Sequence, residues 1–200
     1  MVFDLDGNSW EDVKQLAINL EELLNKLKIP FNRFSSGRFL HYHIFVDDKE
    51  IATTQIDNKF IEIVKYHFEN VLKKQSYTIE DVLNFNREVF RAIPLILLER
   101  LNQSEKAHID LQKFESSRCL IRAEGSINKK TNAYKTYLET LPQEQVLVRA
   151  SWQVKFPSEI KVWKPEANFY WKLFLLAYRK YVKPKYQIEI KTKTITKKQK

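Results

Sequence analysis

The stretch Val2-Phe3-Asp4-Leu5-Asp6, followed directly by Gly7-Asn8-Ser9, decides how the rest of the chain is interpreted. Its apolar residues predict a buried strand, and on a strand residues i and i+2 point to the same side. Asp4 and Asp6 therefore share one side, where their negative charges repel each other. A cation between them would relieve the repulsion, and Mg²⁺ or Mn²⁺ prefer carboxylate and phosphate oxygens. The alternative is that one aspartate caps the next helix and the other is solvated.

Helices and strands are mixed along the chain without strict alternation. Ser9 is a good N-cap for a helix whose apolar residues recur from Trp10 to Leu27, and Pro30 ends it. Further helices are predicted at 57–74, at 78–102 with a break or new first turn at Pro94, and at 165–182. Strands are predicted at 31–34, 39–46, 51–55, 108–111, 119–122 and 133–138, with shorter strand-like pieces at 145–149, 151–156, 160–163 and 186–196.

This pattern predicts an α+β fold in which helices pack on a mixed or antiparallel central sheet. The 200 residues, 44% of them hydrophobic, are enough for one domain with a good core. No linker rich in glycine, proline or serine divides the chain, so we expect one domain over residues 1–183 and a tail over 184–200.

Composition limits where the protein works. No apolar run approaches the roughly 18 residues that a membrane helix needs, and the chain starts directly into a predicted strand, so we expect neither a membrane segment nor a signal peptide. The single cysteine, Cys119, excludes an internal disulfide framework and a cysteine-rich zinc module. We therefore expect a cytoplasmic or nucleoid-associated protein.

The positive charge is concentrated at one end. The net charge is +9, and nine lysines and arginines lie between Arg179 and Lys200 against one acid, Glu189. Such a basic segment favours a polyanionic partner, although a tail that only improves solubility has the same composition.

Each of the three glycines, Gly7, Gly37 and Gly125, lies in a polar cluster beside a predicted strand. The second cluster, Ser36 to Val46, offers a turn with backbone amides and a hydroxyl, the forked cation of Arg38, and two histidines on one strand face. These groups suit a triphosphate. The third cluster combines Asp110 with a basic turn at 118–131, which on its own is typical of a solvated loop.

Together the three clusters resemble the three motifs of the archaeo-eukaryotic primase superfamily, in the same order and with the expected flanking strands. The residues that carry the resemblance are Phe3-Asp4-Leu5-Asp6; Ser36-Gly37-Arg38 with His43-Ile44-Phe45-Val46; Ile109-Asp110 with Leu120-Ile121-Arg122; and Gly125-Ser126-Ile127-Asn128-Lys129-Lys130-Thr131. The resemblance covers roughly residues 1–138 and implies a primase-type catalytic core, RRM-like in topology.

The resemblance also implies an activity, DNA replication by a nucleotidyltransferase that makes primers from NTPs or dNTPs on a single-stranded DNA template. It implies that Asp4, Asp6 and Asp110 hold two divalent ions, Mg²⁺ or Mn²⁺. It further implies that eight residues bind the nucleotide: Ser36, Gly37, Arg38, His43, Arg122, Ser126, Asn128 and Lys130. A large regulatory primase subunit is a further partner that the family suggests.

The second motif departs from the family pattern in two ways. Leu40 replaces the expected second glycine, and His43 follows one residue late, so His41 stays an alternative phosphate ligand. In the third motif Asn128 stands at the position of the family histidine.

Two other interpretations stay open. Phe3-Asp4-Leu5-Asp6-Gly7 also resembles the first motif of haloacid-dehalogenase-type phosphatases, with Asp4 as nucleophile, although Asn8 replaces the expected threonine and no later strand ends in a matching acidic pair. The chain could also be a non-catalytic nucleic-acid-binding protein on a primase scaffold, because its basic C-terminal part interleaves lysines with tyrosines.

Overall fold

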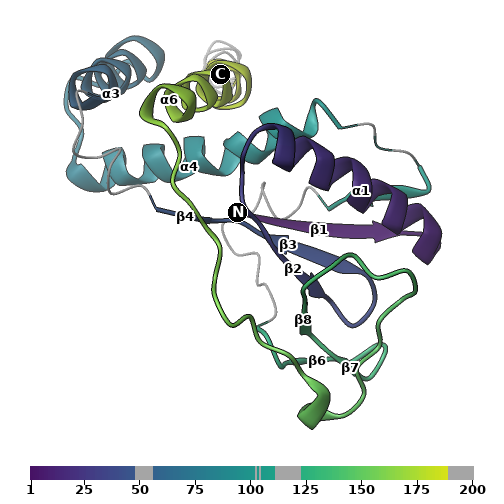
Figure 1. Cartoon of the computed structure of the whole chain (residues 1–200). Helices are drawn as coiled ribbons and strands as arrows, with labels where there is room; N and C mark the ends of the chain where they lie inside the picture. The colour runs from purple at the N-terminus through teal and green to yellow at the C-terminus, as the bar shows by residue number, and fades with distance from the viewer. Residues whose placement is uncertain (48–55, 102, 104, 111–122, 189–200) are drawn as a thin grey trace, which may run out of the picture. The chain divides into compact units, whose positions relative to one another are not determined.

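A computed structural model describes residues 1–47, 56–101, 103, 105–110 and 123–188 of the chain (Figure 1). Its contacts divide the chain into two compact units, one made of residues 1–47 and 99–164 and the other of residues 48–98 and 165–200. That residues 1–183 act as one catalytic domain stays a prediction. The sequence segments predicted as strands at 51–55 and 119–122 lie outside the described residues.

The first unit contains a five-stranded sheet in the order β5-β1-β3-β2-β8. Every pair of neighbouring strands in this sheet is antiparallel, which confirms the predicted α+β class and the antiparallel central sheet. The strands are β1 (Val2–Gly7), β2 (Asn32–Ser35), β3 (Leu40–His43), β5 (Ala107–Ile109) and β8 (Thr136–Leu138). The acidic strand β1 therefore lies inside the sheet, between β5 and β3.

Helix α1 (Trp10–Lys26) follows β1 and covers one face of the sheet (Figure 1). The Ser9 hydroxyl accepts a hydrogen bond from the amide of Asp12, which confirms the predicted N-cap. A half-buried carboxylate, Glu21, ties the helix to the sheet, because it accepts hydrogen bonds from the Arg33 guanidinium at 2.7 Å and from the Tyr42 hydroxyl at 2.6 Å. Burial and the adjacent Glu21 raise the pKa of Tyr42, so this hydroxyl stays a donor.

Two small sheets complete the first unit. Strand β4 (Phe45–Val46) pairs in parallel with β9 (Val162–Trp163), and β6 (Ile127–Asn128) forms a hairpin with β7 (Ala133–Tyr134). The predicted strands at 145–149 and 151–156 are wrong. The first makes a single bridge, between Val148 and Tyr134, and the second begins with a 3₁₀ turn at Ser151–Gln153.

The described residues of the second unit form helices joined by short non-helical segments, and they contain no strand. The unit contains α3 (Ile56–Lys65), the π-helix η1 (Tyr66–Val71), α4 (Ile79–Leu98), α6 (Ala167–Ala177) and the π-helix η3 (Tyr178–Val182). Residues 183–188 are also helical, so the strand predicted at 186–196 is wrong as far as residue 188. No helix among the described residues is long and apolar enough to cross a membrane.

Helix α4 continues through Pro94, where the sequence predicts a break or a new first turn. An internal proline costs a helix about 3 kcal/mol, because it lacks an N–H group and its ring crowds the carbonyl four residues earlier. Burial offsets this cost, since Pro94 and its neighbours Ile93 and Ile96 lie in the core of the unit.

Candidate functional site

Strand β1 places its two aspartates on the side of the sheet away from α1. Phe3 and Leu5 are buried at 0% and 1% exposure, whereas Asp4 and Asp6 both line one cavity. Asp4 lies opposite His41 of β3, and its Oδ1 is 3.0 Å from His41 Nε2. The predicted common side of the two aspartates is confirmed, and in this structure the Asp4 carboxylate contacts a histidine side chain.

Asp110 lies beside Asp4. Its backbone amide donates a hydrogen bond of 2.9 Å to the Asp4 carbonyl, directly after the paired residues Leu5 and Ile109. Opposite residues of antiparallel strands project to the same side, with Cβ atoms about 5 Å apart. The fold therefore brings the backbone of Asp110 beside Asp4, although about a hundred residues of sequence separate them.

The cavity that contains Asp4 and Asp6 has a volume of about 570 Å³. It is lined by residues from β1, from the turn before β3 and from the β6–β7 hairpin: Asp4, Leu5, Asp6, Ser36, Arg38, Phe39, Ile127, Asn128, Lys129 and Lys130. Nη1 of Arg38 lies 3.6 Å from Oδ1 of Asp6, with both side chains almost half exposed. Two acids and three cations thus surround one hollow, which suits a ligand that carries both metal and phosphate.

The turn at residues 36–39 binds its own amides. The Ser36 hydroxyl accepts hydrogen bonds from the amides of Phe39 at 3.0 Å and Arg38 at 3.4 Å. Gly37 has φ +77°, and a Cβ there would lie 2.7 Å from the carbonyl oxygen of Ala133. In this conformation the turn offers a phosphate mainly the Arg38 guanidinium, and its predicted backbone amides are already used.

The second and third sequence clusters are joined directly. Thr131 Oγ1 donates a hydrogen bond to the Gly37 carbonyl, and the Asn128 amide donates to the Ser36 carbonyl at 3.4 Å. Asn128 is 9% exposed and also accepts from the amide of Lys130. Its observed role is therefore to connect the two turns, while Lys130 itself is exposed at the cavity.

Two further residues are predicted to bind the nucleotide, Ser126 and Arg122. The Ser126 hydroxyl donates 2.6 Å to the carbonyl of Ala123, within its own turn. Arg122 lies outside the described residues.

His43, one of the predicted phosphate ligands, contacts a lysine that the sequence interpretation missed. Lys135 is fully buried, and its Nζ lies 2.9 Å from His43 Nε2. Burial, followed by the charge of Lys135, lowers the pKa of His43 to about 3, so the imidazole is neutral and accepts from the ammonium group. His43 is not among the residues that line the cavity. The sequence contains a signal for this burial, because Lys135 shares one side of a predicted extended segment with Ala133 and Tyr137.

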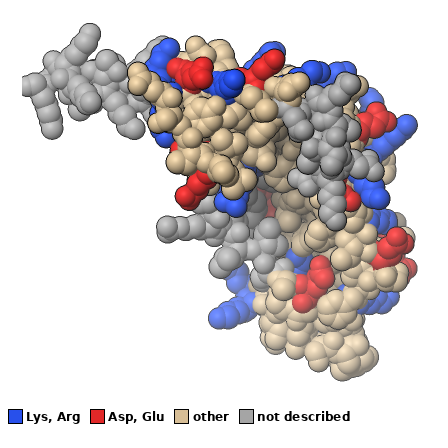
Figure 2. All heavy atoms as spheres, turned by 90° about the vertical axis from the view of Figure 1, so that its left-hand side faces the viewer, with Lys and Arg blue, Asp and Glu red and all other residues tan. Residues whose placement is uncertain are grey.

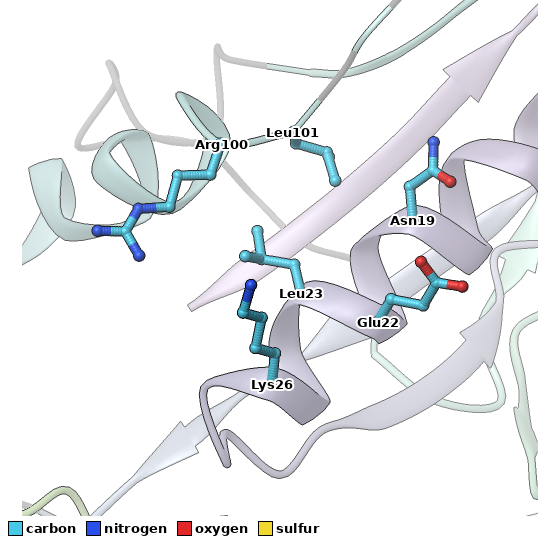
Figure 3. A pocket seen from close by; sticks show the side chains of 6 residues that line it. All are labelled: Asn19, Glu22, Leu23, Lys26, Arg100 and Leu101. Atoms are coloured by element: carbon cyan, nitrogen blue, oxygen red, sulfur yellow. The ribbon is translucent and has the colours of Figure 1, made fainter.

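A second hollow of the first unit, about 310 Å³, lies between α1 and residues 100–101 (Figure 3). It is lined by Asn19, Glu22, Leu23, Lys26, Arg100 and Leu101. Arg100 extends away from the Glu22 carboxylate (Figure 3). With one acid and no paired carboxylates, this hollow is less suited to phosphoryl transfer than the cavity at β1.

Within the described part of the chain, no three histidine, cysteine, aspartate or glutamate side chains form a group that could hold a metal ion. The two-metal site therefore stays a prediction. Comparison of the chain with protein families, with curated proteins and with solved structures finds no match.

Proposed function

We propose that this protein is a primase-type nucleotidyltransferase that joins nucleoside triphosphates on a single-stranded DNA template. The observation that carries the proposal is the cavity at β1, where Asp4 and Asp6 face Arg38, Lys129 and Lys130. The hydrogen bond that the Asp110 amide donates to the Asp4 carbonyl supports it further, because the backbone of the third predicted acid lies beside the first.

The strand order also supports the proposal. Helix α1 connects β1 to β2, β3 lies between these two strands, and β5 lies on the other side of β1. This is the arrangement of a split βαβ unit, which an RRM-like core requires. The three motifs then fall on β1, on the turn into β3 and at the end of β5.

The donor set fits the predicted metal ions, since carboxylate oxygens are the ligands that Mg²⁺ and Mn²⁺ prefer. Asp4, Asp6 and Asp110 would hold them, and such ions stabilise the attacking and leaving oxygens of an in-line displacement. His41 orients the Asp4 carboxylate through its 3.0 Å contact.

The remaining residues of the cavity act on the phosphates. In the reaction, a hydroxyl group of the growing strand loses its proton to water and its oxygen bonds to the α-phosphorus, while the bond from that phosphorus to pyrophosphate breaks. Arg38, Lys129 and Lys130 would meet the negative charge of the departing pyrophosphate. Alignment and charge stabilisation account for most phosphoryl-transfer catalysis, and the cavity offers both.

The test is incorporation of labelled NTPs and dNTPs on single-stranded DNA with Mg²⁺ or Mn²⁺, measured beside phosphate release from a simple monoester. We expect incorporation by the native chain, and its loss in Asp4→Asn and Asp110→Asn with unchanged circular dichroism. Glu11→Gln removes an exposed carboxylate of α1 and is the matched control. Full activity in either aspartate variant would remove the proposal.

The same assay separates the two alternatives. Phosphate release that requires Asp4 would favour the phosphatase, although the antiparallel sheet does not favour a Rossmann-like phosphatase fold. DNA binding without either reaction would favour a non-catalytic binding protein.

A further inference from the structure

Among the described residues of the first unit, two aromatic side chains are more than half exposed. Trp152 is 82% exposed and Phe156 is 62% exposed. Trp163, eleven residues after Trp152, is 4% exposed, so this part of the chain buries one tryptophan and presents the other to solvent. Contiguous exposed apolar surface marks interaction sites, whereas single exposed apolar side chains are normal, so the surroundings of these two rings decide how they are interpreted.

These aromatic residues belong to a segment that is fixed to the candidate site. The Phe156 ring lies against Gly125, because a Cβ built there would be 3.5 Å from its Cζ. The Lys155 carbonyl accepts from the Tyr137 amide at 2.9 Å, and Arg149 donates to the Thr131 carbonyl at 3.0 Å. The segment therefore packs on residues 125–137, which include the β6–β7 hairpin. Ile127 of this hairpin is 42% exposed and lines the cavity.

We name the rings of Phe156 and Trp152, together with the aliphatic side chain of Ile127 at the cavity, the aromatic strip. The cations on the elements that carry it are exposed: Lys129, Lys130, Arg149 and Lys155. Two acids lie three residues from the strip in sequence, Glu124 before Ile127 and the exposed Glu159 after Phe156. The other two acids of this stretch, Glu139 and Glu144, flank a loop whose Gln143 contacts Lys14 of α1.

The space-filling view agrees with this distribution. At the end of the first unit that carries β6 and β7, Figure 2 shows a broad surface without charged residues, bordered by lysine and arginine together with a few acidic residues. An apolar platform bordered by cations is the arrangement that proteins use for single-stranded nucleic acid, because bases stack on the rings while cations follow the phosphates.

We infer that the aromatic strip binds the single-stranded DNA template, with bases stacked on Trp152 and Phe156 as the strand leaves the cavity at β1. This inference rests on the proposed function for the identity of the strand. Single-stranded DNA fits better than a duplex, since only unpaired bases present faces on which an indole ring can stack.

The first experiment measures binding of the full chain to fluorescein-labelled oligothymidylate by anisotropy, without nucleotides or divalent ions. We expect Trp152→Ala and Phe156→Ala each to weaken binding about 5- to 150-fold, the range for loss of one stacked base. Ile79→Ala removes a side chain that is 81% exposed on α4 and is the matched control, with unchanged affinity. Affinity that is the same in all three variants would overturn the inference.

The second experiment tests stacking itself, with the same oligonucleotide lacking bases at successive positions. If Trp152 stacks on a base, one abasic position weakens binding by the native chain but not by Trp152→Ala. If the abasic position weakens binding by the same factor in the native chain and in Trp152→Ala, then Trp152 acts without stacking and the inference is overturned. Quenching gives an independent reading. Trp163 and Trp171 are buried, and the partly buried Trp10 donates its indole N–H to the Gln143 carbonyl, so most quenching by the bases should disappear in Trp152→Phe.

The inference about the aromatic strip and the proposed function can be contradicted independently of each other. If the protein incorporates nucleotides on a template but its DNA affinity is unchanged in Trp152→Ala and Phe156→Ala, the role of the aromatic strip is overturned and the primase proposal stays in place. Binding that depends on both rings without any incorporation would support the strip and remove the primase proposal.

Discussion

Lys135 shows how a single residue can set the charge state of its surroundings. A fully buried ammonium group is costly unless a partner accepts its protons, and the neutral imidazole of His43 is such a partner at 2.9 Å. The His43 ring stacks on His41, and His41 in turn contacts Asp4. The positive charge of Lys135 therefore lies in the same polar layer as Asp4. The lysine therefore favours a neutral His43 over a charged one.

This role gives a prediction for His43. Replacing Lys135 by methionine removes the charge and keeps a side chain of similar length. We expect the pKa of His43 to rise from about 3 yet stay below its ordinary value, since burial is the larger cause of its shift. NMR titration of the imidazole protons measures it. Lys129→Met, which changes an exposed lysine of the cavity, should leave this pKa unchanged, and an unchanged pKa in Lys135→Met would contradict the assignment.

The sequence predicts some of the site residues well and others poorly, for a physical reason. Asp4, Asp6 and Ser9 follow from local rules, because strand alternation and helix capping depend only on near neighbours. The partners of Ser36 and Asn128 do not, since their hydrogen bonds join segments about ninety residues apart. Burial of Lys135 depends in the same way on the distant strand β3.

At the level of elements, the turn at residues 36–39 and the β6–β7 hairpin behave as one body. Gly37 has a positive φ, and a Cβ there would press on the Ala133 backbone. We therefore expect Gly37→Ala to lower the free energy of unfolding by at least about 1–3 kcal/mol, the usual cost of such backbone strain, with an added clash. Urea unfolding measures it.

Gly125→Ala is the matched control for that experiment. Gly125 has nearly the same φ, +75°, but a Cβ there meets only the Phe156 ring at an ordinary distance of 3.5 Å. Its cost should be the backbone strain alone and therefore smaller. Equal losses in both variants would mean that the contact with Ala133 contributes nothing.

The π-helix η1 carries a buried histidine in an aromatic cluster of the second unit. His67 is 2% exposed, packs on Phe85 at a ring distance of 4.6 Å, and its Nδ1 has no hydrogen-bond partner. Burial lowers its pKa to about 4, although the charge of Glu88 acts in the opposite direction. Folding therefore keeps this side chain neutral under conditions in which the unfolded chain binds a proton.

The sign of the resulting pH dependence follows. Between an unfolded pKa of about 6.5 and a folded pKa of about 4, the unfolded state holds more protons, so stability falls as pH falls through this range, by up to about 1.4 kcal/mol per unit. We expect His67→Phe to lose less stability than the native chain between about pH 7 and pH 5. Urea unfolding at both pH values decides it, and equal losses would show that His67 does not cause the dependence.

The sequence predicts an element reliably when its apolar residues recur with a helical period over several turns. The helices α1, α4 and α6 follow from long repeats, whereas segments 145–149 and 151–156 show strand-like alternation without a continuous partner strand. Whether an alternating segment becomes a strand depends on an available neighbour, which is a property of the whole fold.

For the whole molecule, the net charge of +9 bears on DNA binding. The predicted tail boundary at 184 cuts through contacts of the second unit, because Lys185 and Tyr186 both bond to Glu88, at 2.7 and 2.6 Å. A cut after residue 188 keeps these contacts and removes five lysines.

We therefore expect two truncations to differ. Removing residues 189–200 should leave the melting temperature unchanged and reduce the slope of log affinity for single-stranded DNA against log salt, by about 0.7 per lost phosphate contact. Removing residues 184–200 should in addition lower the melting temperature. An unchanged salt slope in both truncations would show that the tail does not contact DNA.

The two units interleave along the chain, and this affects how the protein can form during synthesis. Strands β1 and β3 leave the ribosome early, but their neighbour β5 follows only after the whole first segment of the other unit. Helix α4 likewise waits for α6, which comes about seventy residues later. Each unit must therefore keep an unfinished apolar surface while the other is being translated, so translation speed and chaperones that cover such surfaces should influence the yield of native protein.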